Sequence, residues 1–166
     1  MSKRIETWTL AFCIAFFPPI WAVLAPYANI STGAVALICA GLYVANGNKA
    51  EDGVKISIGF LLGDLWAVLA LKMMSLINMP ESAVTFITLF ILGGLAVLIS
   101  SKMSKYIFCP SWLCGWAIGL TIMAPLGIDK IGSLPLEIGA AMLVGVWYVG
   151  FFLDIAQRKL MKIFSK

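Results

Sequence analysis

The run VKISIGFLLGDLWAVLALKMMSLI, residues 54–77, decides the fold class of this chain. At about 1.5 Å of rise per residue it is long enough, as a helix, to cross the roughly 30 Å hydrocarbon core of a bilayer. Its only acidic residue is Asp64, which lies about ten residues or more from either end of the run. The run is typical of a transmembrane helix, and the surroundings of Asp64 become the first functional question.

The composition of the whole chain agrees with this interpretation. Hydrophobic residues make up 61% of the chain and charged residues 12%, with a mean hydropathy of +0.99, whereas soluble domains are roughly half apolar and a quarter charged. Short polar or Gly/Pro-rich stretches separate the apolar runs. We therefore expect an all-α, polytopic membrane protein with one domain over residues 1–166, folded as a compact bundle of about six transmembrane helices. The expected spans are about residues 7–25, 31–46, 54–77, 82–101, 107–125 and 136–156.

The first apolar run also has features of a secretory signal peptide. It follows Lys3 and Arg4, and Val23 and Ala25 occupy the small-residue positions of a cleavage site. Pro26 directly after that position disfavours cleavage. We therefore interpret residues 7–25 as a transmembrane helix.

Basic residues are divided unequally between the two sides of the expected bundle. If six spans place both termini on one side, that side holds ten of the twelve basic residues, and the positive-inside rule then predicts cytoplasmic termini. The formal net charge of +4 needs no nucleic acid to explain it. The basic residues on the side of the termini are Lys3, Arg4, Lys49, Lys55, Lys102, Lys105, Arg158, Lys159, Lys162 and Lys166, and those on the other side are Lys72 and Lys130.

Sequence patterns for catalysis and metal binding are missing. The chain has no histidine, the commonest metal ligand, and its four cysteines form no close metal-binding pair. It also has no phosphate-binding loop, dinucleotide fingerprint or nucleophile elbow. We expect no enzyme activity, no cofactor and no metal, with the cysteines as small apolar fillers and Glu137 and Asp154 as residues at the membrane boundary.

Asp64 is the strongest candidate for a functional side chain. A charged aspartate at mid-membrane costs at least about 2.5–3.5 kcal/mol, so Asp64 should face protein or water, or carry a proton. Gly59 and Gly63 form a small-xxx-small pair that lets another helix approach closely beside it. Two interpretations stay open, a contact with a pore or substrate and a clamp between helices.

Prolines interrupt two of the expected helices. Pro18 and Pro19 lie inside the first run, and Pro110 lies at the start of the fifth. Proline removes a backbone donor, and in lipid the freed carbonyls need protein or water as partners, so broken helices often line transport sites. The double proline predicts either such a break or a kink that shapes packing, and Pro110 suits a first helical turn.

Internal similarity can be divided in two ways. IWAVLA at residues 20–25 and LWAVLA at residues 65–70 match at five of six positions, and the looser GWAIGL at residues 115–120 suggests three helical hairpins. A three-plus-three division instead places Pro18 and Pro19 opposite Gly93 and Gly94, at an offset of 75 residues. The sequence leaves the type of repeat open.

Several tryptophans lie deeper than the membrane interface that this residue prefers. The indole donors of Trp66, Trp116 and Trp147 need partners inside the bundle or along a wet path. Trp21 lies near the outer end of its expected span. The candidates for pore or substrate contact are Asp64, Trp66, Trp21, Pro18, Pro19 and Trp116, and those for helix packing are Gly59, Gly63, Gly115 and Gly119.

The chain resembles the YcdZ-like family of small bacterial inner-membrane proteins, a domain of unknown function. The similar segments are IWAVLA with the following run to GLYVANG, then GVKISIGFLLGDLWAVL, FCPSWLCGWA and the final apolar run. The resemblance implies a six-helix or similar multi-pass protein of the bacterial inner membrane. It implies no catalytic residue and no role for Asp64.

Two functional hypotheses follow. The first is a channel or facilitator for a small, neutral or weakly polar solute, because the chain combines a deep carboxylate, deep tryptophans and a proline-containing span. The second is a non-transporting membrane scaffold or partner-binding subunit that uses its glycine-lined faces. The expected partners are the lipid bilayer and, for the first hypothesis, the solute. Homo-oligomers are compatible with both, and no nucleic acid is expected.

Overall fold

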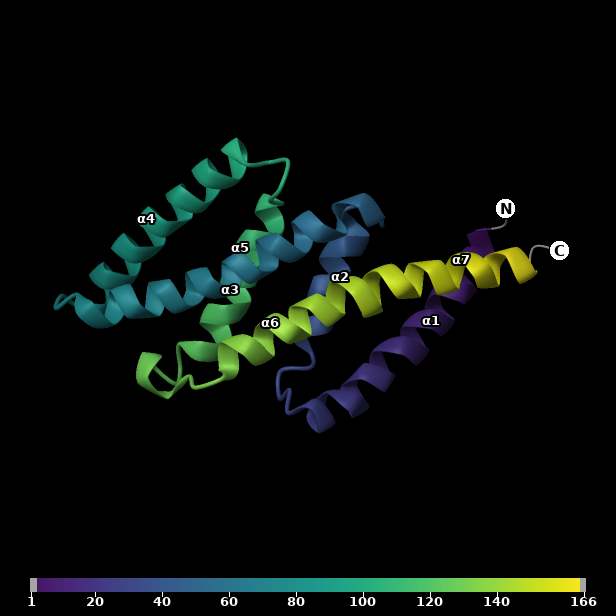
Figure 1. Cartoon of the computed structure of the whole chain (residues 1–166), viewed down its shortest axis with the longest axis horizontal. Coiled ribbons are helices and arrows are strands. Elements are labelled where there is room, and N and C mark those ends of the chain that lie inside the picture. Colours follow the sequence, from purple (N-terminus) through teal and green to yellow (C-terminus); the bar gives the residue numbers. More distant parts are fainter. Residues whose placement is uncertain (1–2, 165–166) are drawn as a thin grey trace.

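The computed structural model describes residues 3–164, and within this range all regular structure is helical. The last three helical segments form one continuous helix, of which the middle segment η4 is π-helical (Figure 1). The helices are α1 (Lys3–Leu24), α2 (Val35–Ala45), α3 (Gly53–Leu76), α4 (Glu81–Lys102), α5 (Cys109–Met123), α6 (Leu134–Val144), η4 (Gly145–Phe152) and α7 (Leu153–Phe164). Short 3-10 turns are η1 (Ala25–Ala28), η2 (Ala50–Asp52) and η3 (Ile128–Lys130).

Four helical stretches are long and apolar enough to cross a membrane, namely Ile5–Ala28, Ala50–Leu76, Glu81–Lys102 and Leu134–Phe164. The other two predicted spans form helices that are shorter than expected. α2 has 11 residues and α5 has 15, so they extend about 17 and 23 Å, less than the roughly 30 Å of a hydrocarbon core. The prediction of six helices agrees with the structure, but four are long and two are short.

Local backbone conformation explains the two short helices. α2 is followed by Gly47 and Asn48, whose positive φ angles of 84° and 54° turn the chain away from the helix. Pro110 lies in the first turn of α5, as predicted, where its missing donor costs nothing. Gly127, with a φ of 75°, reverses the chain soon after α5 ends. The end of α2 therefore agrees with the expected span, and the residues missing from this helix are 31–34 at its start, which form turns instead.

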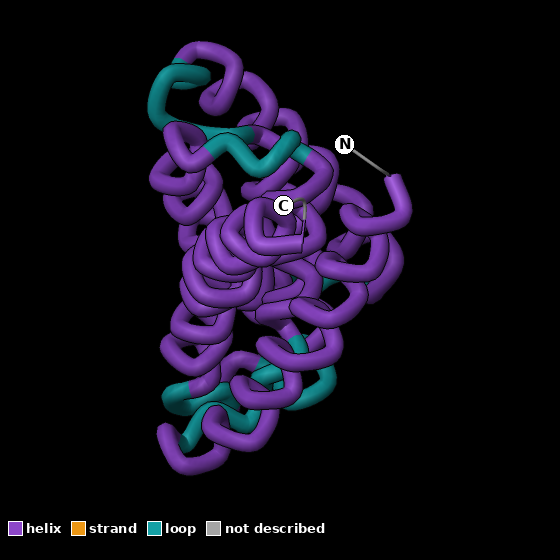
Figure 2. Tube along the Cα trace, turned by 90° about the vertical axis from the view of Figure 1, so that its right-hand side faces the viewer, coloured by secondary structure: helices purple, strands orange, loops and turns teal. Residues whose placement is uncertain are grey.

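The chain is built from two three-helix halves that run in opposite directions. α1, α2 and α3 form the first half, and α4, α5 and the last helix form the second (Figure 1). The short helix of each half packs on the long central helix of the other half: α5 packs closely on α3, and α2 packs on η4 of the last helix. In the same way α4 lies along α3 and α1 lies along α7. The turned view shows the loops gathered mainly at the two ends of the bundle (Figure 2).

Matching contacts place the two halves in register. Trp66 donates a hydrogen bond to the carbonyl of Leu92 at 3.0 Å, and Tyr148 donates one to the carbonyl of Phe17 at 3.4 Å. Phe17 and Leu92 are 75 positions apart (92 − 17), and Trp66 and Tyr148 are 82 apart (148 − 66). The first difference equals the offset of the three-plus-three division, which the structure therefore favours over three hairpins.

The closest helix crossings repeat in the same register. A Cβ atom at Gly63 would lie 2.8 Å from the backbone of Gly115, and one at Gly145 would lie 2.7 Å from Cβ of Cys39. Gly63 and Gly145 are 82 positions apart (145 − 63), and Cys39 and Gly115 are 76 positions apart (115 − 39). The two copies of WAVLA, in contrast, end the outer helix α1 and lie within the central helix α3, so they are not equivalent in space.

The core lies where the central helices cross. Phe60 of α3, Tyr43 of α2 and Met142 of α6 are fully buried there. The outer helices α1 and α4 instead expose large apolar side chains, among them Trp8 and Phe90. Exposed apolar surface of this extent marks an interaction with a membrane or another protein, and it agrees with the composition of a membrane-embedded bundle.

Candidate functional site

Asp64 is buried at the junction of three helices. Its side chain extends from α3 and only 4% of the residue is exposed. A Cβ atom at Gly119 of α5 would lie 3.2 Å from Asp64 Oδ1, and one at Gly139 of α6 would lie 4.0 Å from Oδ2. Two glycines on neighbouring helices therefore make the space that the carboxyl group occupies.

This carboxyl group lacks the partners that a buried polar group normally has. Asp64 Oδ1 is buried without a hydrogen-bond partner, and neither of the two ion pairs in the described part of the chain includes it. Burying a polar group without compensating hydrogen bonds costs free energy, so such an atom in a folded protein calls for a reason. Asp64 is therefore the strongest candidate for a group that binds something the protein itself does not supply.

The four packing glycines lie in one interface between α3 and α5. A Cβ atom at Gly59 would overlap the hydroxyl of Ser111, and one at Gly115 would lie 2.5 Å from the carbonyl oxygen of Phe60. Gly63 and Gly119 have equally close neighbours across the same interface. The two backbones touch, as small-xxx-small faces allow. No solute can pass between α3 and α5 at this level, so a path to Asp64 must approach along the helices.

Two of the tryptophan candidates, Trp66 of α3 and Trp116 of α5, face α4. Trp66 donates to Leu92 of α4 and stacks edge to face on Trp112, with ring centroids 5.1 Å apart. The ring of Trp116 also faces α4, where a Cβ atom at Gly93 would lie 3.7 Å away. Trp66 and Trp116 thus pack against α4, whereas the carboxyl group of Asp64 faces α5 and α6. The structure does not bring them into one ring.

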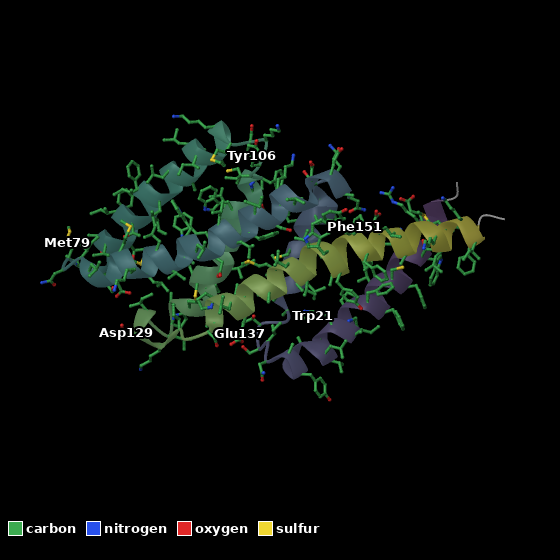
Figure 3. All side chains as sticks on the ribbon, viewed as in Figure 1. Trp21, Met79, Tyr106, Asp129, Glu137 and Phe151 are labelled. Carbon is green, nitrogen blue, oxygen red and sulfur yellow. The ribbon has the colours of Figure 1, made fainter. Side chains whose placement is uncertain are left out.

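The remaining candidates surround a separate groove. α1 continues through Pro18 and Pro19 without a break, so the structure differs from the broken-helix interpretation. Pro18 is buried and Pro19 is exposed. Pro18 and Trp21 line a groove of about 250 Å³ between α1, η1 and α2, and Trp21 donates to the carbonyl of Gly33 at 3.0 Å. This groove lies at the α1 edge of the bundle, where Figure 3 labels Trp21.

A larger groove, which sequence reasoning missed, lies at the corner between α3 and α4, where Figure 3 labels Met79. We call it the α3–α4 groove. Its volume is about 560 Å³ and its walls are mostly apolar, with Glu81 among its polar residues. The groove reaches Leu71, two helical turns or about 10 Å along α3 from Asp64, and Leu120, which follows Gly119. The break in the apolar runs at Asn78, Pro80 and Glu81 was the available signal for this corner.

A cluster of polar side chains lies at the start of α7. Asp154, predicted as a boundary residue, is 8% exposed. Asn48 Nδ2 donates to its Oδ1 at 3.1 Å, and Arg158 Nε donates to its Oδ2 at 2.9 Å. Glu137, the other predicted boundary residue, accepts hydrogen bonds from the backbone and hydroxyl of Ser31. Both acids therefore join segments distant in sequence.

No group of metal-binding side chains assembles among residues 3–164 that are described. The fold and the composition are those of a small helical membrane protein, with two exchanged three-helix halves and one buried, unpartnered carboxyl group.

The chain belongs to the family described as protein of unknown function (DUF1097), whose model matches residues 11–157. This agrees with the expectation of an uncharacterised family, although the match does not carry the narrower YcdZ-like name. No curated protein and no solved structure matches the chain in these comparisons.

Proposed function

We propose that this protein is a multi-pass protein of the bacterial inner membrane that lets a small, neutral or weakly polar solute cross its helical bundle. The observation that carries the proposal is the buried, unpartnered carboxyl group of Asp64 beyond the inner end of the α3–α4 groove. A carboxyl group accepts hydrogen bonds, and its protonated form also donates one. An amide or a hydroxyl of a passing solute is a suitable partner.

The size and charge of the site favour a small solute without a net charge. The α3–α4 groove is about 560 Å³ in volume, while the helices around Asp64 pack closely and leave little room for a large solute. No cation among the described residues pairs with Asp64, so the negative charge of an anionic solute would have to be buried beside it with little compensation. A neutral amide or alcohol avoids this cost.

The terminal methyl group of Met123 and Asp64 Oδ1 lie on the same side of Gly119. Met123 is fully buried at the end of α5, and a Cβ atom at Gly119 would lie 3.1 Å from its terminal methyl group. Methionine has three rotatable bonds and adapts its shape easily. Rotation of Met123 would be one way to open space from the α3–α4 groove towards the carboxyl group.

Flux into liposomes tests this proposal. Purified protein is reconstituted, and the uptake of urea, acetamide and glycerol is followed by light scattering. We expect faster uptake of at least one solute than in protein-free liposomes, a reduced rate for Asp64→Asn, and an unchanged rate for Asp129→Asn, whose side chain is exposed in η3. Uptake no faster than in protein-free liposomes would contradict the function, and equal rates for both variants would remove Asp64 from the path.

The tight α3–α5 interface favours a second candidate, a membrane scaffold or partner-binding subunit. The glycine contacts seal this part of the bundle, and the outer helices expose wide apolar faces. Such a protein would bind another membrane subunit, or a second copy of itself, through α1 or α4. It predicts no solute flux together with a defined stoichiometric complex when the protein is purified in mild detergent, as measured by light scattering during size-exclusion chromatography.

We also propose that both termini face the cytoplasm. The start of α1 and the end of α7 lie side by side (Figure 1), and the basic residues near them supply the positive-inside signal. A reporter fused to the end of the chain, active only in the cytoplasm, should be active. A periplasmic readout would reverse the orientation.

A further inference from the structure

The two halves carry equivalent grooves at opposite ends of the bundle. The α1–α7 groove, named like the α3–α4 groove for the helices around it, also measures about 560 Å³ and runs between the start of α1 and the end of α7. The two grooves differ in depth. The α3–α4 groove reaches the short helix α5 at Leu120 and Ala124, whereas only α1 and α7 contribute to the other one.

A polar cluster separates the α1–α7 groove from the short helix α2. Asn48, at the end of the turn after α2, donates to Asp154 of α7, and Arg158 pairs with the same carboxylate. One turn along α7, the buried side chain of Gln157 donates to the carbonyl of Glu6 in α1 at 3.4 Å. We call Asn48, Asp154, Arg158 and Gln157 the latch, because they join α1, α7 and the turn after α2.

The equivalent positions of the other half form no latch. With the offset of 82, Lys72 and Ser75 of α3 correspond to Asp154 and Gln157, and with the offset of 76, Ala124 corresponds to Asn48. Ser75 donates only to the carbonyl of Lys72 within its own helix. Ala124 has no polar side chain and lines the α3–α4 groove. The same place in the fold is therefore closed at one end and open at the other.

We infer that the latch is a gate, and that the two ends of the bundle open in alternation. The described conformation is latched where α1 begins and α7 ends, and open at the corner of α3 and α4. Inverted repeats of this kind allow one half to adopt the packing of the other with little change in total contact. The inference deepens the proposed function, since alternation would expose Asp64 to one side at a time.

Two features in and beside the latch favour reversible opening. The hydroxyl of Tyr43, which is fully buried, and Oδ1 of Asn48 lack hydrogen-bond partners in the closed arrangement, so the closed state is incompletely satisfied. The π-helical segment η4 directly precedes the latch, and such segments interrupt the regular hydrogen-bond ladder where helices bend. The end of α7 can therefore swing without breaking a regular helix.

Native cysteines report on the gate. Cys13 and Cys39 are fully buried in α1 and α2, the helices next to the latch, whereas Cys109 and Cys114 are half-buried in α5. The protein is held in phosphatidylcholine nanodiscs without any solute and treated with a water-soluble maleimide, and labelling at each cysteine is followed by peptide mass spectrometry. Labelling of Cys109 and Cys114 in the same sample is the internal reference.

The latch is opened by the double variant Asp154→Asn with Gln157→Ala, and more mildly by Asn48→Gly, which suits the positive φ of this position. We expect Cys13 and Cys39 to be labelled about tenfold faster in the double variant, which corresponds to about 1.4 kcal/mol in the opening equilibrium, and by a smaller factor in Asn48→Gly. The matched control is Lys72→Met with Ser75→Ala at the equivalent positions, where labelling of Cys13 and Cys39 should not change.

Unchanged labelling in folded latch variants would overturn the gate, and so would an equal rise in the control variant. If the double variant is aggregated in size-exclusion chromatography, Asn48→Gly alone decides, because it removes the hydrogen bond to Asp154 while glycine keeps the positive φ of this position. The experiment uses no solute. Unchanged labelling would therefore contradict the gate without affecting the flux result. Absent flux together with faster labelling would contradict solute transport and leave the gate supported.

Discussion

Substitution of Gly63 by alanine tests the arrangement of the central helices most directly. The added Cβ atom would overlap the carbonyl oxygen of Trp112 and lie 2.5 Å from the backbone nitrogen of Trp116. Ordinary contacts of a Cβ atom begin at 3.4 Å. All the atoms in the way belong to the backbone, so no side chain can turn aside. The interface between α3 and α5 must therefore open by about 1 Å around Gly63.

The magnitude follows from two opposing terms. Overpacking in a close-packed interior costs typically about 1–3 kcal/mol, and the backbone contacts place Gly63→Ala at the upper end of that range. Replacing glycine by alanine within a helix returns about 1 kcal/mol. The expected net loss for Gly63→Ala is therefore about 2 kcal/mol in the free energy of unfolding, measured by titration of the detergent-solubilised protein with dodecyl sulfate.

Gly94→Ala is the matched control within the chain. Gly94 is a helical glycine of α4 whose added Cβ atom meets nothing within 4 Å. This variant should be as stable as the wild type or up to about 1 kcal/mol more stable. The two variants should therefore differ by about 2–3 kcal/mol. Equal stabilities would show that α3 and α5 do not touch along their glycines, and would refute the packing from which the path to Asp64 was argued.

Three further substitutions test separate contacts by the same unfolding assay. Trp66→Phe keeps an aromatic ring but removes the donor to Leu92, so the protein should lose about 1 kcal/mol of stability, and no loss would contradict the link between α3 and α4. Pro19→Ala, at an exposed position inside α1, should preserve or raise stability because alanine restores a backbone donor, and a loss of more than about 1 kcal/mol would show that α1 needs its proline. Glu137→Ala removes the acceptor for Ser31 near the surface and should cost about 0.5–1.5 kcal/mol; an unchanged stability would mean that water replaces this contact.

The sequence predicts the class of fold because that class depends on composition and on local periodicity. The six helices follow from six apolar runs, and the place of Pro110 follows from the geometry of a first helical turn. The lengths of α2 and α5 were not predictable in this way. They depend on turns such as residues 31–34 before α2, whose conformation is set by the chain around them.

The exchange of partners between the halves was beyond the sequence for a different reason. The equivalent pairs have different side chains, with Trp66 corresponding to Tyr148 and Gly115 to Cys39, so shape is repeated while residue identity is not. The offsets of 75, 76 and 82 also change from helix to helix, since the connecting loops differ in length. Matching letters at one fixed spacing, as with WAVLA, therefore indicated positions that are not equivalent.

The candidate site could likewise be predicted only in part. A deep aspartate beside a glycine pair was evident in the run from residue 54 to 77, because the burial cost of a carboxyl group depends on its depth in the membrane. Gly139 of α6 lies behind that carboxyl group, and the α3–α4 groove lies beyond it. Both depend on segments far apart along the chain. Local reasoning could name Asp64 but not the space around it.

The exchanged packing of the halves also has a consequence for biosynthesis. When α1, α2 and α3 have left the ribosome, α2 still lacks the surface that it will cover, since that surface belongs to η4, about 100 residues later in the chain. Because α2 is too short to span the lipid by itself, it cannot reach its final packing until synthesis is almost finished. α3 meets α5 well before that. Assembly of this bundle is thus expected to begin in its middle, and the segment made second is among the last to find its place.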